Sequence, residues 1–367
     1  MADGQRGSVA VVNAFKAYTG SSSVARSYYD ALVQQNVQAN WYQCVSSRDR
    51  NSYDSLGVAI DGYKFFRDDL NLVFNSLFVF PRKVARLRES LTILTDPVLL
   101  GAAPRLTNST VIVHDLRELV IHRRSVAAGA YFRWLFRRLD EMKYIICDSD
   151  ATRTELLRFY RPDVPVDVIH PCSRISGQPV EHAERSLKRM ARDRTLNLLC
   201  IAADRPYKNI GLYYKLAKLL ETPRRGWNFR FRLISRLGRE SAGEIEQLQI
   251  SNLEVVPAVP DLASAYDEAD ALLQPSLVEG FGLPPVEAMQ FGIPIIGSDV
   301  PCLREVIDTG GVLVDPTDPE QWVSAMIELT DPTAYLKRAG SSADRGKQFT
   351  LGAFGDRLRN WRQERLS

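Results

Sequence analysis

The sequence predicts an α/β protein built from two doubly wound domains. Short runs rich in β-branched residues alternate with amphipathic stretches along the chain, which is typical of βαβ units and mostly parallel sheets. The length of 367 residues is enough for two domains, each with its own core. A polar, charged segment divides the runs into two series. We therefore expect two domains that face one another across a cleft.

The first series of predicted strands lies in residues 1–174, which we assign to the N-terminal domain. Its apolar runs are 8–15, 90–96, 109–115, 144–150 and 166–171. After the first run, a polar loop of small residues that contains Gly20 and Ser21 leads into a helix. The order of strand, loop and helix predicts right-handed crossovers.

The second series lies in residues 190–349, which we assign to the C-terminal domain, with a linker at 175–189. Its runs are 196–203, 229–235, 253–259, 271–276, 294–299 and 310–316. The last stretch, about 350–367, is basic and amphipathic, with Phe354, Leu358 and Trp361 at helical spacing. We expect a C-terminal helix here, as a candidate to pack back on the first domain.

Composition narrows the class of protein. Apolar residues make up 45% and charged residues 25% of the chain, as in globular proteins. The formal charge of +3 is too small to imply nucleic acid by itself. The 5 cysteines are far apart and lie mostly in apolar runs, so we expect reduced thiols in a cytoplasmic protein. The first residues predict neither a signal peptide nor a membrane span.

The stretch "EGFGLPPVEAM", residues 279–289, carries the strongest indication of function. Glu279 follows a buried run and begins a loop, and Glu287 lies about one turn into the predicted next helix. Gly280 and Gly282 let the backbone approach a ligand, and free amides near a helix start favour an anion. Carboxylates beside such amides suit a ligand with hydroxyls and phosphate, as in a sugar nucleotide. For either glutamate alone a solvated surface residue is the better interpretation; for the whole arrangement it is not.

These residues resemble the signature of the retaining glycosyltransferases of the two-Rossmann-domain (GT-B) type, family 4 (glycosyl transferases group 1), which has two glutamates separated by seven residues. The resemblance extends over nearly the whole chain. It includes "YIICDSDATRTELLRFY" with "VDVIHP", "RPYKNIGLYYKLAKLL", and "NLEVVPAVPDLASAYDEADALLQPS". It is specific for fold and reaction class and weak for the substrate.

The resemblance implies roles for the residues of the signature. Glu279 would contact hydroxyls of the transferred sugar, and Glu287 would accept hydrogen bonds from the ribose of the nucleotide. The amides of Phe281, Gly282 and Leu283 would reach the sugar or phosphate of the donor.

Two cations in "DRPYKN" are candidates for the diphosphate. Lys208 matches the lysine of the family, where it would neutralise charge on the leaving phosphate. Arg205 is its expected partner, although the commoner arginine positions of the family are occupied here by Tyr207 and Ala203. Two surface cations at a helix start are the alternative, which the helix dipole disfavours unless an anion is present.

The N-terminal domain contributes weaker candidates. Gly20 and Ser21 stand where two glycines are common in the family, in a loop expected over the diphosphate or acceptor. His114 is expected at a strand end, and the resemblance makes it a contact for the donor sugar. Asp115 would orient His114 or serve the acceptor. Ser149 matches a family serine that is equally compatible with a structural role.

The donor is less defined than the reaction. In the family the base lies near the turn that corresponds to Pro257, Ala258 and Val259, where backbone groups read its edge. Guanine and uracil both remain open, and overall likeness to mannosyl members favours GDP-mannose. Cys172 stands where a glycine is frequent in the family, which leaves the local backbone open.

The mechanism that we expect is transfer of a hexose to a hydroxyl with retention and without a metal. The sequence has no Asp-x-Asp pair placed to hold a metal and diphosphate, so Lys208, Arg205 and helix amides would take that role. The alternatives are an epimerase or hydrolase of the same fold, and a non-catalytic protein that binds sugar nucleotides.

The acceptor is expected to be a glycan or a lipid-linked molecule of cell-surface polysaccharide or glycolipid synthesis. Residues 82–143 are rich in Arg and Lys, with Tyr131, Phe132, Trp134, Leu135 and Phe136 among them. The simpler interpretation is a solvated helix whose aromatic face packs into the core. The alternative, more specific interpretation is that this region contacts anionic lipid headgroups peripherally, on the inner face of the membrane.

Overall fold

The computed structural model describes residues 8–16, 19–46, 56–62, 68–116, 126–257, 259 and 261–366. The chain divides into two compact units: residues 1–172 with 351–367, here called unit 1, and residues 173–350, called unit 2. Among the described residues, no helix is long and apolar enough to cross a membrane.

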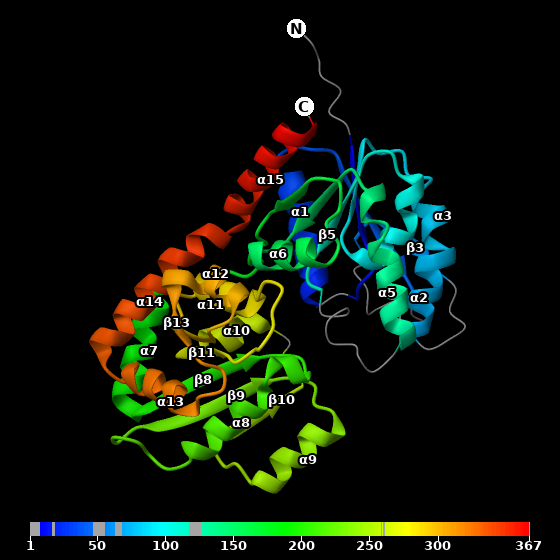
Figure 1. Ribbon diagram of the computed structural model, residues 1–367. Coiled ribbons are helices and arrows are strands. Elements are labelled where there is room, and N and C mark those ends of the chain that lie inside the picture. The colour runs from blue at the N-terminus through cyan, green and yellow to red at the C-terminus, as the bar shows by residue number, and fades with distance from the viewer. Residues whose placement is uncertain are drawn as a thin grey trace. The chain divides into compact units, whose positions relative to one another are not determined.

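Within the described residues, unit 1 is built on a seven-stranded parallel sheet in the order β3-β2-β1-β4-β5-β6-β7 (Figure 1). The strands are β1 (Val9–Asn13), β2 (Ala39–Val45), β3 (Val58–Asp61), β4 (Leu91–Leu94), β5 (Ser109–Val113), β6 (Tyr144–Cys147) and β7 (Val166–Val168). β1, β4, β5 and β6 are buried along their whole length, as expected for strands covered on both faces.

The helices of unit 1 are α1 (Gly20–Gln34), α2 (Asp68–Phe78), α3 (Phe80–Val84), η2 (Pro97–Arg105), α5 (Val126–Phe136), η3 (Leu139–Glu141), α6 (Asp150–Phe159) and α15 (Leu351–Leu366). α15 packs on α1, where the rings of Tyr28 and Phe354 meet edge to face at 4.9 Å (Figure 1). Phe354, Leu358 and Trp361 form its buried face, as their spacing predicts.

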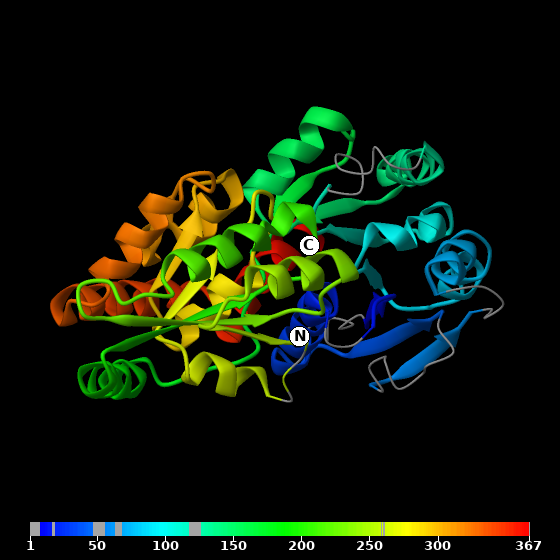
Figure 2. The same ribbon diagram turned by 90° about the horizontal axis from the view of Figure 1, so that it is seen from below.

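Within the described residues, unit 2 contains a six-stranded parallel sheet in the order β10-β9-β8-β11-β12-β13. Figure 2 shows β8 and β9 side by side. The strands are β8 (Thr195–Ile201), β9 (Asn228–Ile234), β10 (Leu253–Val256), β11 (Ala271–Gln274), β12 (Ile295–Ser298) and β13 (Val312–Val314). The predicted class, two doubly wound α/β sheets, is confirmed.

The helices of unit 2 are α7 (Pro179–Asp193), η4 (Pro206–Lys208), α8 (Ile210–Leu219), α9 (Arg239–Leu248), α10 (Leu262–Asp267), α11 (Leu283–Gln290), α12 (Pro301–Ile307), η5 (Asp308–Gly310), α13 (Pro319–Glu328), α14 (Pro332–Gly346) and η6 (Lys347–Phe349). Their core includes the buried rings of Tyr213, Phe229, Phe231 and Trp322.

The structure differs from the sequence-based expectation at β2 and β3, at residues 175–189 and at the start of α1, which is described with the site. Strands β2 and β3 were not predicted, because β2 mixes Asn40 and Gln43 with its apolar residues and β3 is only four residues long. The stretch 175–189, expected to be a linker, contains most of helix α7. Pro179 stands in its first turn, and its apolar residues lie on one face, so a polar composition here marks an amphipathic helix.

Candidate functional site

The carboxyl edge of the unit 2 sheet brings two loops together. β8 and β11 are neighbours in the sheet, and the chain leaves each of them at this edge. The amide of Leu277, after β11, donates to the carbonyl of Tyr207, after β8, at 2.8 Å. This bond joins the segment that holds Lys208 to the segment that holds Glu279, although 71 positions separate them in the sequence.

Lys208 and Glu279 form a largely buried ion pair at this edge. The ammonium of Lys208 lies 2.6 Å from Oε1 of Glu279, and the two side chains are 15% and 5% exposed. Gln274, the last residue of β11, donates from Nε2 to the same Oε1 at 2.8 Å. No described residue donates to Oε2 of Glu279. The carboxylate therefore has one saturated oxygen and one oxygen left for a ligand.

The start of α11 follows directly on this pair. Gly282 precedes the helix with φ of +96°, a conformation that side chains rarely adopt, and a Cβ there would lie 3.1 Å from Leu303. Phe281 packs edge to face on Phe349 at 5.8 Å, so its side chain belongs to the core and only its backbone is suited to a ligand. Leu283 is the first residue of α11 and is half-buried.

Glu287 lies one turn into α11 and is held by an aromatic neighbour. Oη of Tyr266 donates to Oε2 of Glu287 at 2.7 Å, and the Tyr266 ring stacks on Phe291 at 5.6 Å. Burial raises the pKa of Glu287, and the hydrogen bond from Tyr266 opposes part of that increase. Glu287 is thus an acceptor placed by α11 and oriented by α10.

The remaining predicted residues of unit 2 make no side-chain hydrogen bond or ion pair to Lys208 or Glu279 among the described residues. Arg205 is exposed, and no hydrogen bond or ion pair among the described residues joins its side chain to Lys208 or Glu279. Pro257 and Val259 lie in the turn after β10, and Ala258 falls outside the described residues.

In unit 1, Gly20 and Ser21 are not in a loop as expected but in the first turn of α1. Thr19 caps this helix, because its hydroxyl accepts from the amide of Ser22 at 3.2 Å. The small polar residues are an N-terminal helix signal here. Their position still leaves the two residues at the carboxyl side of β1, where ligands of parallel sheets gather.

His114 lies directly after β5 and uses both ring nitrogens. Nδ1 donates to Oδ2 of Asp148 at 2.7 Å, and Nε2 donates to the carbonyl of Thr95 at 2.8 Å. A backbone carbonyl and a carboxylate only accept, so both nitrogens carry hydrogen and the ring is an imidazolium. Burial lowers the pKa of His114, but Asp148, with Asp96 and Asp115, outweighs it and raises the pKa to about 9.

The His114 pair is part of a row of polar side chains along the carboxyl edge of the unit 1 sheet. Gln43 bonds Asn13 at 3.1 Å, and the Thr95 hydroxyl donates to Asn13 at 3.2 Å. The carbonyl of Thr95 then accepts from His114, which bonds Asp148. The row follows β2, β1, β4, β5 and β6 in their spatial order. His114 is consequently a fixed member of a network that spans five adjacent strands.

Ser149, which follows Asp148 in the chain, caps α6 by accepting from the amide of Thr152 at 3.0 Å, which is a structural role.

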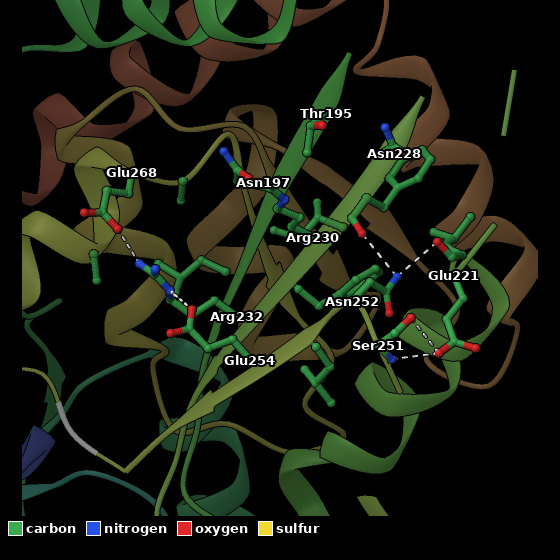
Figure 3. Close-up of a pocket in the computed structure, with 18 of the residues that line it drawn as sticks. Thr195, Asn197, Glu221, Asn228, Arg230, Arg232, Ser251, Asn252, Glu254 and Glu268 are labelled. Atoms are coloured by element: carbon green, nitrogen blue, oxygen red, sulfur yellow. Dashed lines mark hydrogen bonds and ion pairs between the residues drawn. The ribbon is translucent and has the colours of Figure 1, made fainter. Parts of the chain in front are cut away.

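A separate hollow of about 660 Å³ lies on one face of β8, β9 and β10 (Figure 3). The first half of strand β9 alternates there: Phe229 and Phe231 are buried, while Asn228 and Arg230 are exposed. Arg232 is paired with both Glu254 and Glu268. None of the predicted site residues lines this hollow. The sheet here is parallel, and a face of a parallel sheet that is open to solvent is uncommon.

Sequence reasoning missed three residues that place the predicted ones: Gln274, Tyr266 and Asp148. Each is buried and holds a charged site residue through a hydrogen bond. A polar residue inside a buried run, such as Gln274 in "ALLQPS", is the signal from which such a residue could have been predicted.

Two exposed apolar residues next to Glu279 were also not predicted as part of the site. They are Leu277 and Val278, which are 41% and 36% exposed.

Comparison with curated proteins finds mannosyltransferases that match part of the chain. The chain is 29% identical over 233 residues to the O-antigen chain mannosyltransferase RfbU of Salmonella typhimurium, covering 61% of each protein. It is 33% identical over 201 residues to O-antigen chain mannosyltransferase B of Escherichia coli, covering 50% of each. The matched region thus spans between half and two thirds of these relatives.

Comparison with solved structures covers nearly the whole chain. Sucrose-phosphate synthase of Thermosynechococcus elongatus aligns over 97% of this chain and 98% of its own, with a TM-score of 0.76 and 17% identity. Anabaena HepE in complex with UDP-glucose aligns over 98% and 100%, with a TM-score of 0.74 and 13% identity. Residues 195–331 match the family described as glycosyl transferases group 1. The matched residues 195–331 include Lys208, Glu279 and Glu287, and the chain shares its fold with these two solved structures over nearly its whole length.

Proposed function

We propose that this protein transfers a hexose from a nucleoside diphosphate sugar to a hydroxyl of a glycan or lipid-linked acceptor. The observation that carries the proposal is the buried pair of Lys208 and Glu279 at the carboxyl edge of the unit 2 sheet. A cation and a carboxylate with a free oxygen match the two chemistries of such a donor, which are an anionic diphosphate and a polyhydroxylated ring.

Each residue has a distinct part in the proposed reaction. The ammonium of Lys208 moves to the diphosphate and stabilises the charge that develops as the glycosidic bond breaks. Oε2 of Glu279 accepts from hydroxyls of the sugar. Glu287 accepts from the ribose, and the backbone of Phe281, Gly282 and Leu283 faces the phosphate or the sugar. Arg205 is a second, exposed cation that closes on the phosphate when the donor is bound.

The reaction that we propose proceeds with retention and needs no metal. The acceptor hydroxyl forms its bond to the anomeric carbon on the face from which the diphosphate leaves, and its proton passes to the departing phosphate oxygen. Lys208 neutralises that oxygen, so the positive charge that a metal would otherwise supply is contributed by the chain. The anomeric configuration of the product, measured by NMR coupling constants, distinguishes retention from inversion.

We propose mannose, carried by GDP, as the transferred sugar. Two curated relatives are mannosyltransferases that act on O-antigen chains, which supports this donor and a place in the synthesis of a cell-surface polysaccharide. The test is calorimetry with GDP-mannose, GDP, UDP-glucose and ADP-glucose, each with and without a chelator. We expect GDP-mannose to bind in both conditions; binding of UDP-glucose alone, or only with a metal, contradicts the donor or the metal-free site.

Transfer itself is tested with labelled donor and a lipid-linked glycan acceptor. We expect acceptor-dependent release of the nucleotide and label in the glycan. Release without an acceptor would identify a hydrolase, and conversion of the sugar without its release would identify an epimerase. Binding without any turnover would identify a non-catalytic protein.

The acceptor side of the proposal includes contact with anionic lipid. Helices α2, α3 and α5 all pack on η2, so they lie on one side of unit 1 (Figure 1). These helices, with Arg137 directly after α5, expose a basic aromatic surface that consists of Phe78, Arg82, Lys83, Arg133, Trp134 and Arg137. Phe78 and Trp134 are 50% and 40% exposed. Apolar rings among cations suit a headgroup layer.

This contact is tested by co-sedimentation with vesicles that contain phosphatidylglycerol. We expect binding that weakens with salt and is lost in the double variant R133E/R137E, while neutral vesicles do not bind. Equal recovery of wild type and variant, together with full activity on a soluble acceptor, would remove the membrane from the proposal.

A further inference from the structure

Gln274 is a buried polar residue in contact with the proposed catalytic carboxylate. It is the last residue of β11 and is 1% exposed. Its Nε2 donates to Oε1 of Glu279 at 2.8 Å and to the hydroxyl of Ser276 at 2.9 Å. Both hydrogens of the amide are thus used at the point where the strand ends and the site loop begins.

The orientation of the Gln274 amide lowers the stability of the folded protein. Its Oε1 is buried and has no hydrogen-bond partner among the described residues. A buried carbonyl oxygen without a partner is unfavourable, so a side chain chosen only for stability would be apolar here. The flipped amide would place Oε1 against the carboxylate of Glu279 and lose both donors. The orientation is therefore imposed by Glu279 and Ser276, and it leaves the other end of the amide unpaired.

Gln274 and Lys208 share one oxygen of Glu279. Both donate to Oε1, at 2.8 and 2.6 Å. When a diphosphate takes the ammonium of Lys208, the ion pair with Glu279 is lost, and Gln274 is the donor that remains on Oε1. Because Gln274 is fixed by β11, the carboxylate keeps its place and continues to present Oε2.

We propose that Gln274 is a positioning residue that holds Glu279 toward the sugar after the donor has drawn Lys208 away. The inference rests on the proposed function, because it concerns the step at which Lys208 changes partner. It does not require Gln274 to touch the donor. It predicts that loss of the amide affects the chemical step more than donor binding and more than folding.

The experiment compares two glutamine-to-methionine variants of unit 2. Q274M keeps the length of the side chain and removes the donor to Glu279, together with the unpartnered Oε1. Q290M removes a bond of the same kind, from Nε2 of Gln290 to the carbonyl of Gly346 at 2.9 Å, away from the ion pair. For each protein kcat, the Kd of GDP-mannose and the Tm are measured.

We expect Q274M to lower kcat without lowering Tm, and Q290M to lower Tm without lowering kcat. For Q274M we expect kcat to fall by roughly ten- to a hundredfold, as for loss of a hydrogen bond to a charged group. Its donor Kd should change by less than about threefold, and its Tm should be unchanged or higher because a buried unpaired oxygen is removed. For Q290M we expect an unchanged kcat and a lower Tm.

A Q274M protein with wild-type kcat overturns the inference. So does a loss of kcat that is matched by an equal weakening of donor binding or by a drop in Tm, because both indicate a general structural role. A wild-type protein that transfers no hexose from any nucleoside diphosphate sugar overturns the proposed function, and the inference with it. An active wild type with an unaffected Q274M overturns the inference alone.

Discussion

Both units carry a buried ion pair at the carboxyl edge of a parallel sheet, and the two pairs are built differently. In unit 1, His114 and Asp148 are 2.7 Å apart, with side chains 12% and 3% exposed. In unit 2, Lys208 and Glu279 are 2.6 Å apart, with side chains 15% and 5% exposed. Distance and burial are nearly the same, so they do not decide what each pair does.

The difference lies in the unused hydrogen-bond donors of the two cations, since each carboxylate has one oxygen that accepts from no described residue. The imidazole of His114 has two nitrogens, and both are bonded, one of them to the backbone. The ammonium of Lys208 has three hydrogens on a flexible stem, and Oε2 of Glu279 accepts from no described residue. We call the pair of unit 1 closed because its cation has no donor left; Oδ1 of Asp148 is buried and accepts from no described residue. The pair of unit 2 is open, because its cation keeps donors that a ligand can use. The comparison indicates a structural pair in unit 1 and a functional pair in unit 2.

The largest effect that we expect is on the open pair. E279Q keeps the shape of the side chain but removes the charge that faces the sugar, and transfer should fall by about 10³-fold. Thermal stability should fall as well, because the largely buried ammonium of Lys208 loses its counter-charge, so turnover is compared at a temperature at which E279Q is folded. The matched control is E328Q, which breaks an exposed pair with Arg338 in the same unit. Equal turnover in E279Q and E328Q would contradict the functional role of the unit 2 pair.

The closed pair should be more important for folding than for turnover. D148N leaves a buried imidazolium without its carboxylate, and loss of one partner of a buried pair costs about 3–5 kcal/mol. Urea unfolding followed by tryptophan fluorescence measures this loss. D140N is the control, since Asp140 is an exposed carboxylate in the same unit that accepts from the amide of Asp163. A D148N protein as stable as D140N would show that unit 1 does not depend on the pair.

The pH dependence of stability sharpens the same contrast. The pKa of His114 is raised to about 9 in the folded protein, from about 6.5 in an unfolded chain. Its contribution is therefore fully present below pH 6.5 and is lost as the pH rises through 9, by about 3 kcal/mol. The groups that face it are Asp148, Asp96 and Asp115. We expect the difference in unfolding free energy between wild type and H114Q to shrink between about pH 6.5 and 9.5. A constant difference would show that the ring is not an imidazolium.

The smallest effect concerns Glu287, which belongs to the open site and is half-buried. Burial raises its pKa, so the ionised carboxylate opposes folding above that pKa and does not below the unfolded value. E287Q should consequently raise Tm at about pH 7 and leave it unchanged at about pH 3.5. Affinity for the nucleotide should fall by about tenfold, because the charged acceptor that we propose for the ribose is lost. A variant with lower Tm at neutral pH would contradict this account.

The sequence predicted the fold class because the buried strands of both sheets are continuous apolar runs. It missed β2, where Gln43 looks like a solvated residue but is 1% exposed and bonded to Asn13. The start of α1 was also interpreted as a loop, since Gly20 and the serines after it suit both a loop and a capped helix. Local composition does not distinguish these cases; the neighbours in space do.

For the candidate site, the motif placed Glu279, Glu287 and Lys208 in one unit, and the structure joins Lys208 to Glu279. The residues that hold them were not predictable, because Gln274, Tyr266 and Asp148 act through contacts with partners in other segments. His114 was expected to contact the sugar, and that role stays a prediction. With both nitrogens engaged in this structure, such a contact requires one of its bonds to break or a different atom to meet the donor.

The central claim is that the ion pair of unit 2 opens for the diphosphate of the donor. A crystal structure of the protein with GDP-mannose tests it directly. We expect the ammonium of Lys208 to lie on a phosphate oxygen, with Glu279 still bonded to Gln274 and its free oxygen on a sugar hydroxyl. An intact pair of Lys208 and Glu279, with the nucleotide bound elsewhere, for example on the open face of β8–β10, would contradict the account.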